Sequence, residues 1–362
     1  MINEKLLKSD ERALLTLRSL YKEYGYQPFK MSKFEEYDLY VRNKDFLISD
    51  GIITFTDTSG RLLALKPDVT LSIIKNGTDE AGCRQKVYYN ENVYRTSGET
   101  RQYKEIMQTG LECIGDVGTY ELFEVLLLAA KSLASISDDY VLEISHMGVL
   151  SGLLADVGAG EEFDREIAKC VKEKNAHEIA SIGAKYGVDP EKTAALCEFI
   201  GIYGSPKTVV ERLTPLCKNG ISQKALATLC ELAELFRGRE EEKHVRFDFS
   251  TVNDMSYYSG IVFGGFIDGI PESVLSGGQY GRLMKKMGRR ADAVGFAIYL
   301  DLLSSLDGDR EEYDVDVLLL TSEGTLPREV LDRTDAIRNE GKSVSVQRAI
   351  PEKLRYRELI RI

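Results

Sequence analysis

The sequence lacks the features that mark a membrane protein, a disulfide-stabilised protein or a zinc protein. It has no run of about 18 apolar residues, the length that would span a bilayer. Its N-terminal segment is charged throughout (MINEKLLKSDERALL), without the apolar core of a signal peptide. The six cysteines form no C-x-x-C pair and the three histidines are scattered. We therefore expect a cytoplasmic protein with reduced thiols, no metal and no other cofactor.

Negative charge outweighs positive charge. The chain has 47 Lys and Arg against 58 Asp and Glu, a formal net charge of −11. Such an acidic protein is a poor general binder of polyanions, because a phosphate backbone rewards clustered cations. One local cluster contains no acid: Arg282, Lys285, Lys286, Arg289 and Arg290. A solvated helix face is its ordinary explanation, and contact with a phosphate or an acidic partner is the functional alternative.

Length and composition indicate a folded protein with more than one domain. At about 150 residues per domain, 362 residues correspond to two or three domains, and 43% hydrophobic residues are too many for a disordered chain. From about 161 to 242, Leu, Ala and Ile recur at helical spacing. We predict a helical insertion over 161–242, between the two parts, 1–160 and 243–306, of one strand-containing domain.

The end of the sequence predicts a separate small unit over 313–362. Val315–Leu320 is mostly apolar and typical of a strand, and Ser343–Gln347 resembles a second one. Between them, Pro327 and Gly341 fit the start and the end of a helix. The β-α-β order predicts a small parallel sheet.

A predicted hairpin carries the first candidate binding residues. Strand-like runs over Lys86–Tyr94 and Lys104–Ile114 flank a polar loop. In the second run, Gln108, Gly110 and Glu112 alternate, so they share one face of the strand. An amide and a carboxylate with a glycine between them would leave a shallow slot for a small zwitterion. A solvated strand face with a space-saving glycine is the ordinary alternative.

Two other segments place polar groups beside apolar runs. Asp68 and Thr70 follow Pro67, where they can cap a helix or, alternatively, hold an ammonium group. Tyr257 and Tyr258 precede a predicted strand. Adjacent tyrosines are more often packing residues, but their hydroxyls can pair with an imidazole.

Glycines mark two further segments, Ser276–Tyr280 and Gly295–Ala297. Glycine at such points permits close approach of the backbone to a ligand, although a simple turn has the same composition.

The order and spacing of these motifs are more specific than any one of them. Over residues 1 to about 306 the chain resembles the catalytic fold of the histidyl-tRNA synthetases. The matching segments are Tyr24–Tyr26, Lys66–Thr70, Val93–Arg95, Gln108–Glu112, the helical insertion, Tyr257–Tyr258, Ser276–Tyr280 and Gly295–Ala297. The resemblance implies an α+β, class II aminoacyl-tRNA synthetase-like fold, with an antiparallel sheet flanked by helices, and a dimer. The tail resembles a truncated anticodon-binding α/β domain.

The resemblance also implies a pocket for histidine. Its residues are Asp68, Thr70, Arg95, Gln108, Glu112, Tyr257 and Tyr258. Asp68 and Thr70 match the positions that hold the α-amino group, and Gln108 lies near the same head group. Glu112 and Tyr257 match groups that hold the imidazole nitrogens. The chemistry is consistent, because a neutral imidazole needs one acceptor and one donor.

The nucleotide side departs from the family pattern. Asn253 and Leu302 stand where the synthetases carry arginines, and Tyr299 replaces a glycine that leaves room for the nucleotide. Arg95 is retained as a candidate phosphate ligand, but Ser97 replaces a glutamate. Loss of one preorganised group that stabilises developing charge costs about 10²- to 10³-fold in rate. We therefore predict a protein that is not an enzyme.

This combination resembles the regulatory subunits of ATP phosphoribosyltransferase, synthetase-like proteins of histidine biosynthesis. The resemblance implies histidine as ligand and allosteric regulation of a short-form catalytic subunit. It also implies a homodimer within a hetero-octamer and makes tRNA an unexpected partner. Two alternatives are a working histidyl-tRNA synthetase and a stand-alone amino-acid-binding protein recruited to another enzyme or to RNA.

Overall fold

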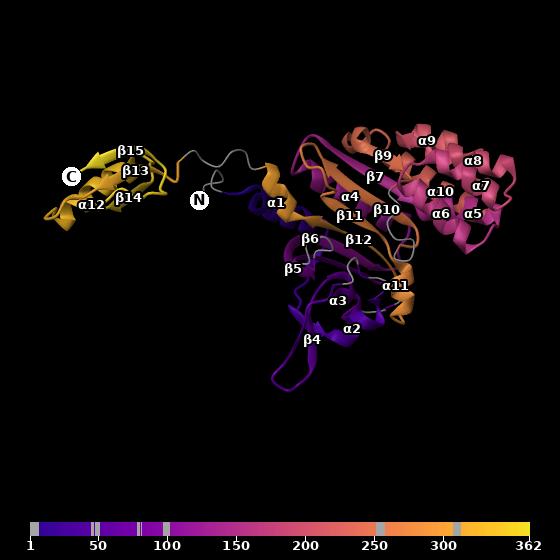
Figure 1. The fold of residues 1–362 in the computed structure, drawn as a ribbon, viewed down its shortest axis with the longest axis horizontal. Coiled ribbons are helices and arrows are strands. Elements are labelled where there is room, and N and C mark those ends of the chain that lie inside the picture. Colours follow the sequence, from indigo (N-terminus) through magenta and orange to yellow (C-terminus); the bar gives the residue numbers. More distant parts are fainter. Residues whose placement is uncertain are drawn as a thin grey trace. The chain divides into compact units, whose positions relative to one another are not determined.

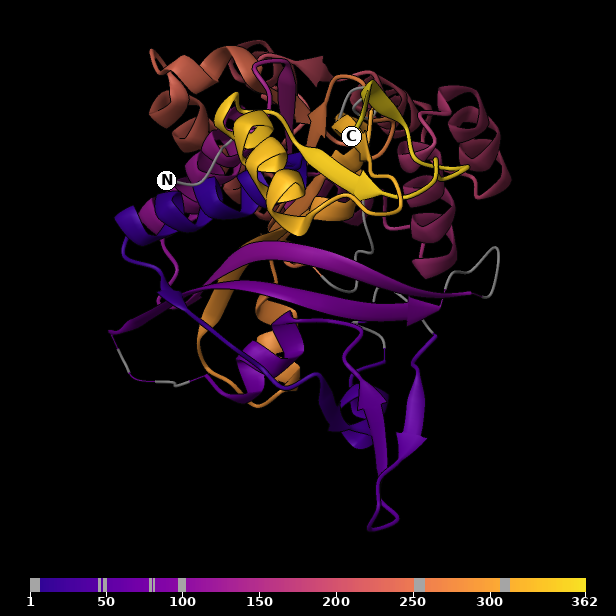
Figure 2. The same cartoon turned by 90° about the vertical axis from the view of Figure 1, so that its left-hand side faces the viewer.

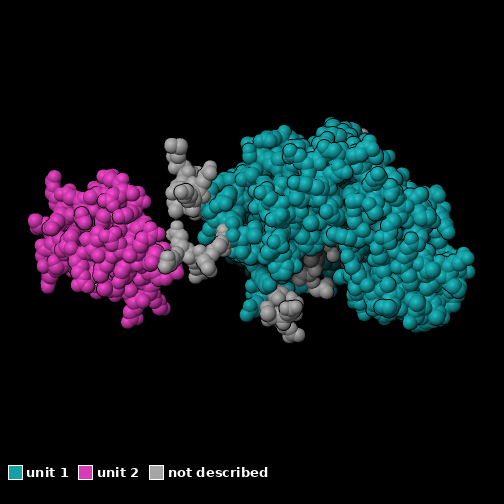
Figure 3. Space-filling model, turned by 90° about the horizontal axis from the view of Figure 1, so that it is seen from above, with its two compact units in different colours: residues 1–306 teal, residues 307–362 magenta. Residues whose placement is uncertain are grey.

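The computed structural model describes residues 7–44, 47, 51–77, 80, 82–96, 102–250, 258–306 and 313–362. Packing divides the chain into two compact units, Met1–Leu306 and Asp307–Ile362, which are coloured separately in Figure 3. Residues 161–242 are not separated from the first unit by this division, so the boundaries of the helical insertion stay a prediction.

The core of the first unit is a large sheet that is antiparallel at most of its pairings. Across the described residues the strand order is β1-β5-β6-β12-β11-β10-β7-β9-β8, and only the β1–β5 and β7–β9 pairs are parallel. In this order the strands are Gln27–Pro28, Arg84–Thr96, Tyr103–Gly115, Asp292–Tyr299, Leu275–Gln279, Ile261–Ile267, Tyr140–His146, Val245–Asp248 and Tyr203–Gly204. The predicted hairpin is the pair β5–β6.

Helices pack against this sheet, and their burial follows their sequence pattern. The helices α1 (Ser9–Glu23) and α4 (Thr119–Ala134) contact it together with the 3-10 helix η4 (Leu300–Leu306). Helix α1 buries one stripe that includes Leu17 and Tyr21. Helix α4 is apolar almost all round and is buried along most of its length, which makes it the central helix of the unit.

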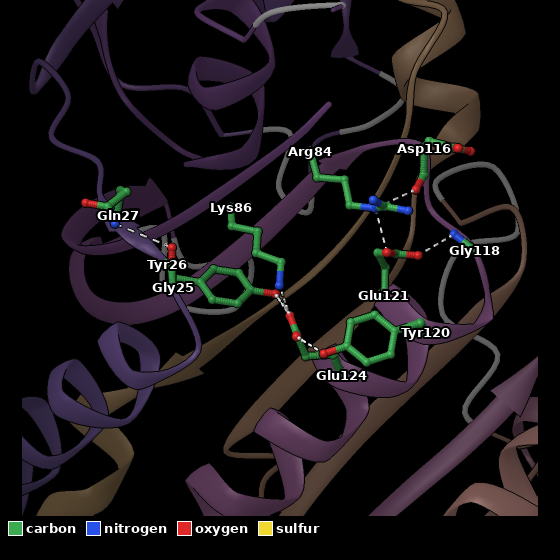
Figure 4. Close-up of polar contacts among 10 residues, drawn as sticks. All are labelled: Gly25, Tyr26, Gln27, Arg84, Lys86, Asp116, Gly118, Tyr120, Glu121 and Glu124. Atoms are coloured by element: carbon green, nitrogen blue, oxygen red, sulfur yellow. Dashed lines mark hydrogen bonds and ion pairs between the residues drawn. The ribbon is translucent and has the colours of Figure 1, made fainter. Parts of the chain in front are cut away.

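Charged side chains join the start of α4 to the start of β5 (Figure 4). Glu121 and Glu124 are buried in the first turns of α4. Their carboxylates lie 2.5 Å from the Arg84 Nε and the Lys86 Nζ, respectively. The Tyr26 hydroxyl also donates to Glu124, at 3.3 Å. Because both buried acids are paired, the cost of removing their charges from water is offset.

A group of helices lies at one end of the first unit, beside β7 and β9 (Figure 1). They are α5 (Met147–Val157), α6 (Glu161–Lys172), α7 (Ala176–Lys185), α8 (Pro190–Ile200), α9 (Pro206–Leu213), α10 (Gly220–Phe236) and the 3-10 helix η3 (Glu240–His244). Side-chain caps from Asn175, Asp189, Ser205 and Asn219 begin four of them.

A small antiparallel sheet with the order β2-β4-β3 projects from the first unit (Figure 2). Its strands are β2 (Phe34–Glu36), β3 (Thr54–Thr56) and β4 (Leu62–Leu65). Three short helices accompany this part of the fold and the β11–β12 connection: α2 (Tyr37–Arg42), α3 (Thr70–Lys75) and α11 (Gly281–Lys286). The segment between β4 and α3 brings Asp68 and Thr70 toward the main sheet.

The second unit contains the predicted β-α-β and one strand more. Strand β13 (Val315–Leu320), helix α12 (Pro327–Asn339) and strand β14 (Val344–Gln347) lie where the sequence predicts them. Strand β15 (Tyr356–Arg361) was not predicted, and it pairs with β13 in the parallel order β14-β13-β15. Two arginines and a glutamate interrupt its apolar pattern, because an edge strand exposes one side to water.

None of the helices in the described ranges combines the length and hydrophobicity needed to cross a bilayer.

Candidate functional site

A narrow cavity lies over β6, β11 and β12, beside the segment that leads into α3. It has a volume of about 40 Å³. Six of the seven residues predicted to bind histidine line it: Asp68, Thr70, Arg95, Gln108, Glu112 and Tyr258. The seventh, Tyr257, lies outside the described residues. The fold therefore brings together side chains that are 190 positions apart in the sequence, from Asp68 to Tyr258 (258 − 68).

Glu112 is the most tightly held group of the cavity. Its side chain is only 2% exposed. One carboxylate oxygen accepts from the Thr70 hydroxyl at 2.9 Å, and the other accepts from the Tyr280 hydroxyl. Burial raises the pKa of Glu112 to about 8, against the opposing effect of these two hydrogen bonds. The cavity thus contains an acid that titrates near neutral pH.

Asp68 and Arg95 form the charged end of the cavity. The Asp68 carboxylate accepts from the Leu71 N–H at 2.9 Å, as a residue that stabilises the start of α3 would. Burial raises the pKa of Asp68, while that hydrogen bond and the charge of Arg95 oppose the shift. The Arg95 Nε donates to the Pro67 carbonyl at 2.9 Å. The N-cap of α3 is Val69, so neither Asp68 nor Thr70 occupies the predicted N-cap position. Asp68 binds the first turn from one residue earlier and also lines the cavity.

The glycines of the site make room for protein side chains. A Cβ atom at Gly295 would lie 1.7 Å from the Glu112 Oε2, and one at Gly278 would lie 2.5 Å from the ring of Tyr258. Sequence reasoning assigned glycines 276–280 and 295–297 to close approach of a ligand. In the structure they admit the side chains that form the pocket.

The open slot predicted over Gly110 is wrong in detail. A Cβ atom there would lie 2.6 Å from the Tyr89 hydroxyl, so the ring of Tyr89 occupies that space. Gln108 and Glu112 do share one face, as predicted, and both line the cavity.

The residues of the nucleotide side are seen in part. The Tyr299 hydroxyl lies 2.9 Å from the Ser276 Oγ, and both side chains line the cavity. Leu302 packs, half-buried, against the hydrophobic core. Asn253 and Ser97 lie outside the described residues.

The basic cluster of residues 282–290 has a partly structural role. Two nitrogen–oxygen distances of 3.0 Å join the Arg289 guanidinium to the carbonyls of Ile74 and Lys75, at the end of α3. A cation at a helix C-terminus is stabilised by the helix dipole. Arg282, Lys285 and Lys286 are exposed on α11.

Sequence reasoning missed two tyrosines of the site. Tyr280 donates to Glu112, and Tyr89 faces it across the β5–β6 hairpin. Tyr280 ends the segment Ser276–Tyr280, which was singled out for its glycines and for its match to the synthetases, but not for its tyrosine. No spacing in the sequence indicates that its hydroxyl reaches β6, because that contact depends on how α11 begins after β11.

A model of the histidyl-tRNA synthetase family matches residues 3–303 of the chain. The chain belongs to the histidyl-tRNA synthetase family. The predicted α+β, class II synthetase-like fold is thereby confirmed.

Among the curated members of the family that are similar to this chain, several carry the name ATP phosphoribosyltransferase regulatory subunit. The protein of that name from Oceanobacillus iheyensis is 28% identical over 329 residues, which are 90% of this chain and 81% of the relative. The one from Syntrophotalea carbinolica is 26% identical over 354 residues, 94% of this chain and 82% of the relative. The resemblance to regulatory subunits that the sequence predicts is confirmed.

Solved structures show the same fold at lower identity. An ATP phosphoribosyltransferase regulatory subunit/histidyl-tRNA synthetase from Bacillus halodurans C is 24% identical, with a TM-score of 0.77 over 98% of this chain and 93% of that one. A histidyl-tRNA synthetase from Nostoc sp. PCC 7120 gives 0.69 at 20% identity, over 95% and 83%. The ATP phosphoribosyl transferase (HisG:HisZ) complex from Thermotoga maritima gives 0.64 at 20%, over 80% and 97%.

Proposed function

We propose that this chain is a non-catalytic regulatory subunit of ATP phosphoribosyltransferase, which binds histidine in the cavity around Glu112 and modulates a short-form catalytic subunit. The observation that carries the proposal is the meeting of six predicted histidine-binding residues in one buried cavity. The names of the similar curated proteins support the regulatory role.

The polar groups of the cavity suit a zwitterion with an imidazole side chain. Glu112 is a buried acceptor for an imidazole N–H, and Tyr258 supplies a hydroxyl at the same cavity. Asp68 is the carboxylate for the α-ammonium group, and Arg95 is the cation for the α-carboxylate. A ligand that leaves such buried groups unpaired is rejected, so the site would be selective.

We expect histidine binding to move side chains at the cavity wall. A water molecule needs about 10–15 Å³ of cavity volume, so a cavity of about 40 Å³ holds roughly three waters. Histidine is larger than three waters. A ligand that changes the conformation of its site can supply the coupling of about 1–3 kcal/mol that allosteric regulation requires.

The proposal excludes catalysis because of the groups that replace the nucleotide-binding residues. Tyr299 fills the wall of the cavity where a synthetase has glycine, and its hydroxyl is bonded to Ser276. Leu302 packs against the core and offers no cation to a phosphate. Asn253 completes the set in the sequence.

The partner in this proposal is the catalytic phosphoribosyltransferase. The Thermotoga maritima structure of similar fold is a complex named for that enzyme. We extend the assembly to this chain as a homodimer within a hetero-octamer, in the cytoplasm.

Three measurements test the function together. Histidine should raise the melting temperature of the isolated protein, and ATP should not alter histidine affinity in calorimetry. Histidine-dependent exchange of pyrophosphate into ATP should be absent. Robust exchange would identify a working synthetase instead, whereas no response to histidine would remove the ligand from the proposal.

A further inference from the structure

A second hollow lies in the helical part of the first unit, where α9, η3 and β9 meet. Helix α9 and strand β9 are labelled in Figure 1. It has a volume of about 600 Å³, within the range of small-molecule sites of about 300–1,000 Å³. None of its lining residues belongs to the cavity around Glu112. Four cations line it, although the protein as a whole is acidic: Lys207, Arg239, Lys243 and Arg246.

We propose that this hollow binds a compact phosphate anion with two or more negative charges, such as pyrophosphate or the phosphate chain of a nucleotide. The proposal is independent of the function proposed above, because it rests on a different set of residues.

The two arginines of the hollow are held in place by carbonyl groups. The Arg246 Nη1 donates to the carbonyls of Lys243 and Val245, at 2.9 and 2.7 Å. The Arg239 Nε donates to the Leu235 carbonyl at 3.0 Å, and its guanidinium carbon lies 5.2 Å from the centre of the Phe123 ring. Carbonyls orient a guanidinium without neutralising it, so both arginines keep their full charge for a ligand.

The remaining charges of the hollow favour a multiply charged ligand. Within the described ranges, Lys207 and Lys243 form no ion pair, and neither arginine pairs with a carboxylate. Glu240 and Glu242 oppose the four cations, which leaves a net charge of +2 (4 − 2). Glu242 already accepts from the Gly238 N–H at 2.7 Å. A monoanion gains little from this balance, whereas a di- or trianion gains more.

Phosphate suits the hollow better than an extended polyanion does. Guanidinium groups bind phosphate oxygens in pairs of parallel hydrogen bonds, which selects for phosphate geometry. A net charge of −11 over the chain repels a long polyanion that extends beyond the hollow. The helix start at α9 adds little, because the Ser205 hydroxyl already accepts from the Thr208 N–H.

Calorimetric titration of the full chain with pyrophosphate, at constant ionic strength, tests the proposal. Arg246→Gln should weaken binding at least about tenfold, as expected for the loss of one charge-assisted contact. Lys207→Gln, at an exposed residue without hydrogen bonds that the fold requires, should weaken it severalfold. Lys172→Gln on α6 is the matched control and should leave binding unchanged.

The outcomes separate the alternatives. Equal losses in Lys172→Gln and Lys207→Gln, or no binding of pyrophosphate, would overturn the proposal. Binding of a short RNA without binding of pyrophosphate would also overturn it, because it would place an extended strand on this face. A cooperative thermal unfolding transition in Arg246→Gln like that of the wild type, measured by circular dichroism without ligand, would show that the variant is folded. If that transition is lost, Lys207→Gln decides the question alone.

Discussion

The two hollows of the first unit differ in volume and in the burial of their charged groups. The cavity around Glu112 has a volume of about 40 Å³ and buries its acids among hydroxyls from Thr70 and Tyr280. The hollow beside Arg246 has a volume of about 600 Å³ and exposes most of its cations to water. We expect the first to be selective, because an unsuitable ligand leaves buried groups unpaired. We expect binding at the second to depend on charge and available space.

Substitution of the central acid should have the largest effect on the cavity around Glu112. Glu112→Gln removes the carboxylate that would accept the imidazole N–H, and histidine affinity should fall by about 1–3 kcal/mol because one buried partner is lost. Isothermal titration measures the change. Glu105→Gln, at an exposed position of the same strand, is the control and should bind normally. Unchanged affinity in Glu112→Gln would place histidine elsewhere.

The same variant should change the pH dependence of stability. Burial raises the pKa of Glu112 from 4.5 to about 8, so between these values the folded protein holds a proton that the unfolded chain releases. Its contribution to stability is complete below about pH 4.5 and is lost as the pH rises through 8.

Urea unfolding without ligand checks this sign. Wild type should lose stability relative to Glu112→Gln between these pH values, by at most about 1.4 kcal/mol per pH unit. Parallel stability curves for the two proteins would mean that Glu112 is ionised in the folded state throughout.

Salt should affect ligand affinity differently at the two hollows, with the smaller change at the cavity around Glu112. Raising the salt concentration from about 0.05 to about 0.5 M shortens the screening length severalfold. Pyrophosphate binding at the exposed cations should weaken about tenfold, while histidine affinity should change less than about twofold because its partners are buried. Equal salt sensitivity of the two ligands would contradict this contrast.

The sequence predicted those parts of the site that depend on local pattern. Alternation along β6 placed Gln108 and Glu112 on one face, and the structure has both at one cavity. The predicted segments 66–70 and 276–280 also meet there. Their meeting could not be derived from periodicity, and the resemblance to a known family supplied it.

The parts that were missed depend on packing between distant elements. Tyr89 fills the space over Gly110 because the β5–β6 register places these two residues opposite each other. Tyr280 reaches Glu112 from another strand connection. Strand β15 was missed because its charged residues break the apolar pattern of a strand, although it pairs with β13. Three cations of the second hollow lie within residues 239–246, where three glutamates interrupt them, and Lys207 comes from a distant helix.

The absence of a side chain at Gly295 makes room for Glu112 on the neighbouring strand. A methyl group on Gly295 would compete with the Glu112 carboxylate for one volume, at 1.7 Å, and would also lie 2.4 Å from the Leu111 carbonyl. Gly295→Ala would therefore displace the Glu112 carboxylate without altering any polar group. Alanine at position 295 is therefore incompatible with the observed position of the Glu112 side chain.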